Sequence, residues 1–229
     1  MSSKQASILE IFESRQGEGI RVGEMQVFIR FAGCGVRCDY CDTPESIPPD
    51  SVKTWALDDV VKQATSPGLP RVISLTGGEP LNQVDFLQKL IPALRAKGCR
   101  IYLETNGILP EALAKIVNDC DCIAMDFKPE SAIGHDVWEA HRWFLEIGGG
   151  KLFVKMVLTD KTTWREFQKG VGLIACIRPE IPLVLQPATP QGGLGTIPLE
   201  RLASWWISAA RRLKDVRILP QVHRLWGIA

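Results

Sequence analysis

Short apolar runs rich in β-branched residues alternate along the chain with longer amphipathic stretches. The short runs have the length and composition of buried strands, and the longer stretches have the apolar spacing of helices that cover a sheet. The expected strands are Ile8–Phe12, Gln26–Phe31, Arg71–Leu75, Cys99–Glu104, Cys122–Asp126, Leu152–Leu158, Pro182–Gln186 and Val216–Leu219. The expected helices are Ala56–Ala64, Val84–Lys97, Pro110–Asp119, Asp136–Glu146, Thr163–Ile177 and Pro198–Leu213.

Polar residues and glycines follow several of these strands at their carboxyl ends. The segments are Thr76-Gly77-Gly78-Glu79-Pro80, Glu104-Thr105-Asn106-Gly107, Asp126-Phe127-Lys128 and Gln186-Pro187. Strands that alternate with helices form right-handed βαβ units, so their carboxyl ends share one edge of a parallel sheet. Ligand sites in barrels and in open α/β sheets lie at that edge. The sequence therefore predicts an α/β fold with a single ligand-binding mouth.

Length and composition favour one globular domain over residues 1–229. The 229 residues are 45% apolar and 23% charged, which is typical of a chain with a buried core. The net charge of +1 gives no basis for binding nucleic acid or an anionic membrane surface. No stretch reaches the roughly 18 apolar residues of a membrane helix, and the first residues lack the apolar region of a secretory signal. We therefore expect a cytoplasmic protein.

The chain has seven cysteines, and three of them lie in the segment Cys34-Gly35-Val36-Arg37-Cys38-Asp39-Tyr40-Cys41. An odd number and a tight cluster favour metal binding over disulfides. The four remaining cysteines stand in apolar surroundings and are expected to be small buried side chains: Cys99, Cys120, Cys122 and Cys176. His135 and His141 are expected on the solvated surface.

Three clustered thiolates fit an iron–sulfur cluster better than they fit zinc. A cluster usually takes four thiolates, so three would leave one iron open to a second molecule. Structural zinc needs four closed ligands at short spacing, and the nearest histidine, His135, is far along the chain. Zinc remains an alternative if the fold recruits a distant fourth ligand.

Cys34, Cys38 and Cys41, with the aromatic Tyr40 before the last cysteine, resemble the motif of the radical S-adenosylmethionine superfamily. Gly77-Gly78-Glu79-Pro80 after a strand resembles the superfamily's Gly-Gly-Glu-Pro motif, whose backbone and carboxylate hold the methionine amino group. The resemblance implies a partial β/α barrel of about six parallel strands. It also implies a [4Fe–4S] cluster on the three cysteines, which supplies the electron that cleaves bound S-adenosylmethionine.

Segments at both ends of the chain narrow the resemblance to the 7-carboxy-7-deazaguanine synthase family. They are Gln16–Gly19, Phe28–Cys34, Cys41-Asp42-Thr43 and Leu219–Gly227. This resemblance implies conversion of 6-carboxy-5,6,7,8-tetrahydropterin to the deazapurine with loss of ammonia, as in queuosine biosynthesis. It further implies Mg²⁺, a homodimer and an electron donor such as a flavodoxin or a ferredoxin.

The family resemblance also assigns residues by motif position. Substrate contacts would come from Arg15, Gln16, Gly17, Glu18, Arg30, Thr76, His223 and the terminal carboxylate of Ala229. Contacts to S-adenosylmethionine would come from Tyr40, Cys41, Asp42, Gly78, Glu79, Glu104, Asn106, Asp126, Phe127, Lys128, Gln186 and Pro187. Thr43 would ligate Mg²⁺, which favours oxygen ligands with several waters. An arginine fork such as that of Arg30 suits a planar carboxylate.

One motif departs from the family and leaves an alternative open. Asp126-Phe127-Lys128 stands where the family commonly has Ser-Pro-Lys, and glycyl-radical enzyme activases carry an Asp-x-Lys at that strand. An activase would use the same cluster and cofactor on a protein substrate. A third possibility is a zinc-stabilised binding module without catalysis.

The metal content of the purified protein distinguishes a zinc-binding module from a synthase or an activase, which both hold an iron–sulfur cluster. Anaerobically purified protein is expected to be brown and to hold about four irons per chain. Serine at Cys34, Cys38 or Cys41 should lower the iron content and abolish radical turnover. A colourless protein that holds zinc would contradict this expectation.

Overall fold

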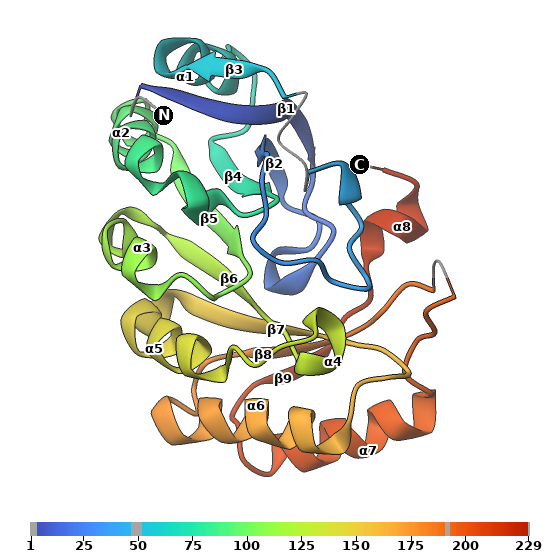
Figure 1. Cartoon of the computed structure of the whole chain (residues 1–229). Coiled ribbons are helices and arrows are strands. Elements are labelled where there is room, and N and C mark those ends of the chain that lie inside the picture. Colours follow the sequence, from blue (N-terminus) through green and yellow to red (C-terminus); the bar gives the residue numbers. More distant parts are fainter. Residues whose placement is uncertain (1–3, 47–51, 191–192, 229) are drawn as a thin grey trace.

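The computed structural model describes residues 4–46, 52–190 and 193–228. Within them, nine strands form one sheet in the order β3-β1-β2-β4-β5-β6-β7-β8-β9 (Figure 1). The strands are β1 Gln5–Arg15, β2 Met25–Phe31, β3 Thr54–Ala56, β4 Val72–Gly77, β5 Arg100–Thr105, β6 Cys122–Phe127, β7 Leu152–Leu158, β8 Leu183–Pro187 and β9 Val216–Ile218. Strands β2 and β4 to β9 run parallel, while β1 is antiparallel to both β2 and β3.

The helices that follow the parallel strands cover one face of the sheet (Figure 1). They are α1 Leu57–Ala64, α2 Val84–Ala96, α3 Pro110–Ala114, α5 Trp138–Gly148, α6 Trp164–Ile177 and α7 Leu199–Ala210. The short helices α4 Glu130–Ile133 and α8 Val222–Trp226 lie at the ends of connections. In the described residues β3 and β9 do not pair, so the sheet is an open, partial barrel. The expected fold class is confirmed, with seven parallel strands rather than about six.

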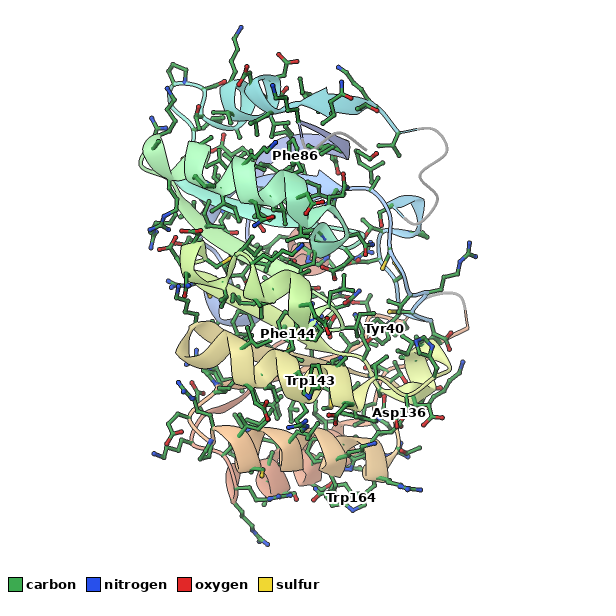
Figure 2. The ribbon with its side chains drawn as sticks, turned by 60° about the vertical axis from the view of Figure 1, so that its left-hand side comes forward. Tyr40, Phe86, Asp136, Trp143, Phe144 and Trp164 are labelled. Carbon is green, nitrogen blue, oxygen red and sulfur yellow. The ribbon has the colours of Figure 1, made fainter. Side chains whose placement is uncertain are left out.

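Figure 2 looks onto the helical layer and shows α5 turning neighbouring side chains in opposite directions. Phe144 is buried against the sheet, whereas Trp143 points outwards and is 43% exposed. The described chain contains no helix that is both long enough and apolar enough to cross a membrane.

The stretch expected as one helix over Pro110–Asp119 is interrupted. Helix α3 ends at Ala114, and a 3-10 turn follows at Val117–Asp119. The Lys151 ammonium binds the Val117 and Asn118 carbonyls at 2.9 and 2.8 Å. This cation, which directly precedes β7, binds carbonyl groups of the 3-10 turn, so the turn that replaces the end of the expected helix is stabilised from another part of the chain. Strand β3 and helices α4 and α8 were not expected, and all three are short.

Period-two alternation along the parallel strands separates the two faces of the sheet. One set of side chains packs under the helices in the main core, including Leu75, Leu103, Met125, Met156 and Leu185. The alternate set faces the inside of the barrel. Its lower part is a smaller apolar cluster formed by Val72, Tyr102, Cys122, Ala124, Phe153 and Val184. Polar side chains occupy the next inward positions above this cluster.

Burial corrects two of the expectations for cysteine and histidine. Cys99, Cys120 and Cys122 are buried as expected, but Cys176 is exposed because it lies on the outer side of α6. His141 is fully buried on α5, where it was expected on the surface, because it faces the sheet. His135 is exposed, as expected.

Candidate functional site

A cavity opens on the inner face of the sheet, at the carboxyl ends of the parallel strands. It brings together most of the side chains that the sequence singled out. The candidate residues that line it are Arg15, Gln16, Gly17, Glu18, Arg30, Cys34, Cys38, Tyr40, Cys41, Asp42, Thr43, Thr76, Gly78, Glu104, Asn106, Asp126, Lys128, Gln186 and His223. The structure therefore places one site where the strand-end pattern predicts one mouth.

Three candidates among the described residues do not line the cavity. Phe127 and Pro187 sit at positions that alternate with the inward-facing ones, and the Phe127 side chain is fully buried against Trp138 on the helical side. Only the backbone of either residue could serve a ligand. The Glu79 side chain is buried as well. Ala229 lies outside the described residues.

The cysteine loop begins where β2 ends and is anchored at its base. Gly33 N–H donates to the Ser46 carbonyl at 2.7 Å, and Cys41 N–H donates to the Cys38 carbonyl at 3.1 Å. The turn after β4 packs tightly against this base, because Gly78 N–H donates to the Phe31 carbonyl at 2.9 Å. A Cβ on Gly78 would lie 2.3 Å from the Gly33 carbonyl oxygen, which explains a glycine there.

The three thiols are half-buried and near one another, and burial raises the pKa of Cys38 and Cys41. Metal ligation requires thiolates, and a metal ion ionises the thiols that bind it. Three thiolates are one fewer than a closed structural zinc site or a fully ligated cluster takes, so this donor set fits a [4Fe–4S] cluster with one open iron.

The Glu79 carboxylate differs from its expected role, because it is turned away from the cavity and fully buried. It accepts hydrogen bonds from Leu81 N–H at 3.0 Å, from the Thr105 hydroxyl at 2.9 Å and from Asn106 N–H at 2.8 Å. Burial raises its pKa to about 7. Glu79 thus ties the turn after β4 to the turn after β5, and its own turn lines the cavity through Gly77 and Gly78.

Next to the cysteine loop, Asp126 and Lys128 form a largely buried ion pair, in which Lys128 Nζ lies 2.6 Å from Asp126 Oδ2. The Lys128 ammonium also lies 5.0 Å from the centre of the Tyr40 ring. Burial opposes the charge of Lys128, but the Asp126 carboxylate raises its pKa above the usual value. A second cation, Lys155 on β7, lies 3.7 Å from Asp126. The pair therefore belongs to a larger charge network.

The network continues to Glu18, whose carboxylate oxygens both accept hydrogen bonds. Lys155 pairs with one oxygen, while the Gln186 and Gln221 amides donate to the other at 3.1 and 2.7 Å. Burial alone would raise the pKa of Glu18, but the Lys155 charge and these hydrogen bonds lower it to about 2. Glu18 therefore presents a fixed negative charge to any ligand at neutral pH.

Glu104 collects hydrogen bonds from three neighbouring side chains. It accepts from Gln16 at 2.8 Å, from Ser74 at 3.1 Å and from Thr76 at 3.2 Å. Burial raises its pKa. Through these bonds Glu104 of β5 fixes Gln16, which directly follows β1, and two residues of β4 around one point of the cavity wall.

The two distant ends of the chain meet at this wall. Val222 N–H donates to the Gly17 carbonyl at 2.8 Å, and a Cβ on Gly17 would lie 2.5 Å from His223. His223 Nε2 lies 3.9 Å from the Asp42 carboxylate. Glu18, Asp42 and His223 can bring ligand atoms within 4.8 Å of one another, but the Gln221 amide also donates to both carboxylates. The arrangement suits a ligand that carries N–H donors.

Arg15 and Arg30, which were expected to bind the substrate carboxylate, each already donate a hydrogen bond within the protein. Arg30 donates to Glu10 at 2.7 Å and lies over the Phe12 ring, and Arg15 donates to the Gly23 carbonyl at 3.2 Å. Thr43, the expected Mg²⁺ ligand, donates from its hydroxyl to Asp42 at 3.2 Å. Each keeps further capacity to bind a ligand, since an arginine has five N–H donors and a hydroxyl two lone pairs.

Several buried polar atoms of the wall have no hydrogen-bond partner among the described residues. They include Asn106 Nδ2, Asp126 Oδ1 and Gln186 Oε1. Unpaired buried polar atoms cost free energy unless a ligand or water satisfies them. Their unused hydrogen-bonding capacity beside the cysteine loop therefore fits a polar ligand with donors and acceptors, as S-adenosylmethionine has.

Sequence reasoning missed Lys155, Gln221 and Thr105. Lys155 had a recognisable signal, since it is a lone charge inside the apolar strand β7. Gln221 lies in the C-terminal motif next to His223, but its contact with Glu18 spans most of the chain. Thr105 points to Glu79, and nothing in the local sequence indicates that pairing.

Comparison with known proteins identifies the superfamily to which the chain belongs. Residues 28–132 match the Radical SAM superfamily, which implies S-adenosylmethionine and a [4Fe–4S] cluster. The solved structure of QueE from Escherichia coli superposes with a TM-score of 0.67 at 21% identity, covering 96% of this chain and 95% of that one. Fold, cysteine loop and cavity together define a radical S-adenosylmethionine protein.

Two full-length relatives narrow the class to one family. A 7-carboxy-7-deazaguanine synthase from Geobacter sulfurreducens is 40% identical over 99% of each chain. Another from Methanothermobacter thermautotrophicus is 34% identical over 98% of each chain. The chain belongs to the 7-carboxy-7-deazaguanine synthase family.

The Lys155 pair provides a test of the charge network. Lys155→Met leaves the Glu18 carboxylate buried without its cation, so we expect the free energy of unfolding of the apoprotein to fall by about 3–5 kcal/mol. Urea denaturation at neutral pH measures the change. The double variant Glu18→Gln/Lys155→Met should recover at least part of the loss. Lys161→Met, which breaks an exposed pair with Asp39, is the control and should change nothing. Equal effects of the two lysine variants would contradict a buried network.

Proposed function

We propose that the protein is a 7-carboxy-7-deazaguanine synthase that converts 6-carboxy-5,6,7,8-tetrahydropterin to 7-carboxy-7-deazaguanine. The observation that carries the proposal is the fixed Glu18 carboxylate, held by Lys155 and two glutamine amides at the inner end of the cavity. The aminopyrimidinone edge of a pterin carries adjacent N–H donors, which a carboxylate accepts in pairs. The family membership supports the same substrate.

In this proposal different residues of the cavity wall bind different parts of the substrate. Gln16, Gly17, Thr76 and His223 border the pterin, and Arg15 and Arg30 bind its carboxylate through guanidinium forks. Arg30 is already oriented by Glu10. A water-poor site strengthens these interactions and holds the substrate in one orientation.

The cofactor would lie between the cysteine loop and the carboxyl ends of β4 to β8. When bound and reduced, the [4Fe–4S] cluster on Cys34, Cys38 and Cys41 supplies the electron that cleaves S-adenosylmethionine. The backbone at Gly78 and the side chains of Glu104, Asn106, Asp126 and Lys128 are proposed to hold the cofactor, with the wall at Tyr40, Cys41, Asp42 and Gln186 along its adenosyl part. Phe127, Glu79 and Pro187 contribute only through their backbone. The Ala229 carboxylate remains a proposed substrate contact.

Further details of the proposal come from the family resemblance. The reaction is that of a carbon–nitrogen lyase that releases ammonia, Thr43 ligates Mg²⁺ together with the substrate carboxylate and water, and the protein is a homodimer. The reductant is a flavodoxin or a ferredoxin. A low-potential cluster requires a reducing compartment, which supports the cytoplasm.

Turnover tests the reaction. Reconstituted enzyme, supplied anaerobically with the carboxytetrahydropterin, S-adenosylmethionine and a reductant, should release 7-carboxy-7-deazaguanine and ammonia. Glu18→Gln should lower kcat/KM by about 10- to 100-fold, because a hydrogen bond to a charged group is worth about 1.5–3 kcal/mol. Glu13→Gln, at an exposed position of β1, is the matched control. Liquid chromatography with mass spectrometry quantifies the product.

Absence of product from enzyme that still cleaves S-adenosylmethionine would leave a glycyl-radical activase as the better reading. Asp126-Phe127-Lys128 is the observation that favours it. The Asp126 pair with Lys128 is shared with Lys155, and Lys155 in turn holds Glu18. That link supports a role in a small-molecule site rather than in docking a polypeptide.

Thr43 provides a test of the Mg²⁺ assignment. Thr43→Ala removes the hydroxyl, and we expect the Mg²⁺ concentration for half-maximal turnover to rise on the order of tenfold, as for other single groups at metal sites. Thr43→Ser keeps the hydroxyl and should behave as the wild type. An unchanged Mg²⁺ requirement in Thr43→Ala would remove this residue from the metal site.

A further inference from the structure

Asn106 lines the cavity, and three hydrogen bonds fix its backbone and its side-chain oxygen. Its backbone N–H donates to Glu79 at 2.8 Å, and its backbone carbonyl accepts from His141 Nε2 at 3.2 Å. Its side-chain oxygen accepts from Ile108 N–H at 3.1 Å. This last bond assigns the amide orientation, so Nδ2 is a buried donor without a partner in the described structure, on a residue that lines the cavity.

His141, near the start of α5, holds this turn from the helical side of the sheet. It is fully buried, and burial lowers its pKa to about 4, so the ring is neutral at physiological pH. A carbonyl can only accept, so the hydrogen of the neutral ring is on Nε2. Nδ1 then has no partner within the described residues. Phenylalanine would fill the same space without an unpaired nitrogen, so the bond to Asn106 is what the histidine adds.

The ring of His141 also contacts the neighbouring strand end. It stacks on Phe127 with centroids 4.9 Å apart and meets Trp138 edge-on. Gly107 lies directly over it, since a Cβ there would approach the ring to 3.3 Å. Phe127 separates Asp126 from Lys128, whose side chains both line the cavity. One side chain on an outer helix therefore supports the ends of both β5 and β6.

We propose that His141 is a positioning residue for S-adenosylmethionine, because it fixes the turn that presents the Asn106 amide to the cofactor. The inference rests on the proposed contact between Asn106 and the cofactor. His141 does not line the cavity, so it acts on cofactor affinity through the geometry of Asn106. Glu79 holds the same turn from its other side.

Three variants separate positioning from packing. His141→Phe keeps an aromatic ring on Phe127 but removes the donor. His141→Gln keeps an N–H donor that can reach the Asn106 carbonyl. Trp138→Phe disturbs the same aromatic cluster without touching the hydrogen bond, so it serves as the packing control. Far-UV circular dichroism establishes that each variant is folded.

The main readout is the Kd for S-adenosylmethionine, measured by equilibrium dialysis on anaerobically reconstituted protein without substrate. His141→Phe should raise the Kd about five- to tenfold, as the loss of one well-placed hydrogen bond does. His141→Gln and Trp138→Phe should stay within about twofold of wild type. Hydrogen exchange of the apoprotein gives an independent readout, since the Gly107 and Ile108 amides should exchange faster in His141→Phe only.

An unchanged Kd in His141→Phe would overturn the inference, as would equal rises in His141→Phe and His141→Gln or an equal rise in Trp138→Phe. The variant Asn106→Ala then shows whether the assignment of Asn106 or the role of His141 is wrong. If Asn106→Ala leaves the Kd unchanged, the assignment of Asn106 is wrong and the role of His141 falls with it. If Asn106→Ala raises the Kd and His141→Phe does not, only the role of His141 is wrong. Neither result depends on turnover of the pterin.

Discussion

A parallel strand can turn only every second side chain inwards, and in this sheet those inward positions must provide both a floor and a binding wall. The apolar cluster around Tyr102 and Phe153 fills the lower part of the barrel. Directly above it, the same strands place Glu104, Lys155 and Gln186. Charged groups at this depth are tolerated only when they are paired. The chain of contacts from Glu18 through Lys155 to Asp126 and Lys128 meets that requirement, so the site is organised before any ligand binds.

The same alternation explains how far the sequence predicts the fold. Long apolar runs separated by amphipathic stretches identify most strands and helices, because burial on both sides of a parallel sheet leaves a strong pattern. The break after α3 leaves no such pattern, since the turn that follows it is held by Lys151, which lies just before β7 and more than thirty residues further along the chain. His141 looks like a surface residue in a polar stretch, and only the packing of α5 shows it to be buried.

The parts of the site that could be predicted are those whose residues lie close together in the sequence. The three cysteines and the glycine turn after β4 are recognisable from spacing alone, and the structure brings them to one cavity. The role of Glu79 was not predictable, because whether a carboxylate points to a ligand or to a neighbouring turn depends on the path of β5. The partners of Glu18 lie on strands and segments far along the chain, so no local motif could indicate them.

The docking of the Val222–His223 segment on the Gly17 loop affects the order of folding. Contacts of such large sequence separation carry the highest loop-closure entropy, and they form late when the strands between them must pair first. A molecule with β2 and β4–β8 already paired would hold the cysteine loop in place and yet lack the wall that Val222 and His223 form at the Gly17 loop. Completion of the cavity therefore depends on contacts that join the two ends of the chain.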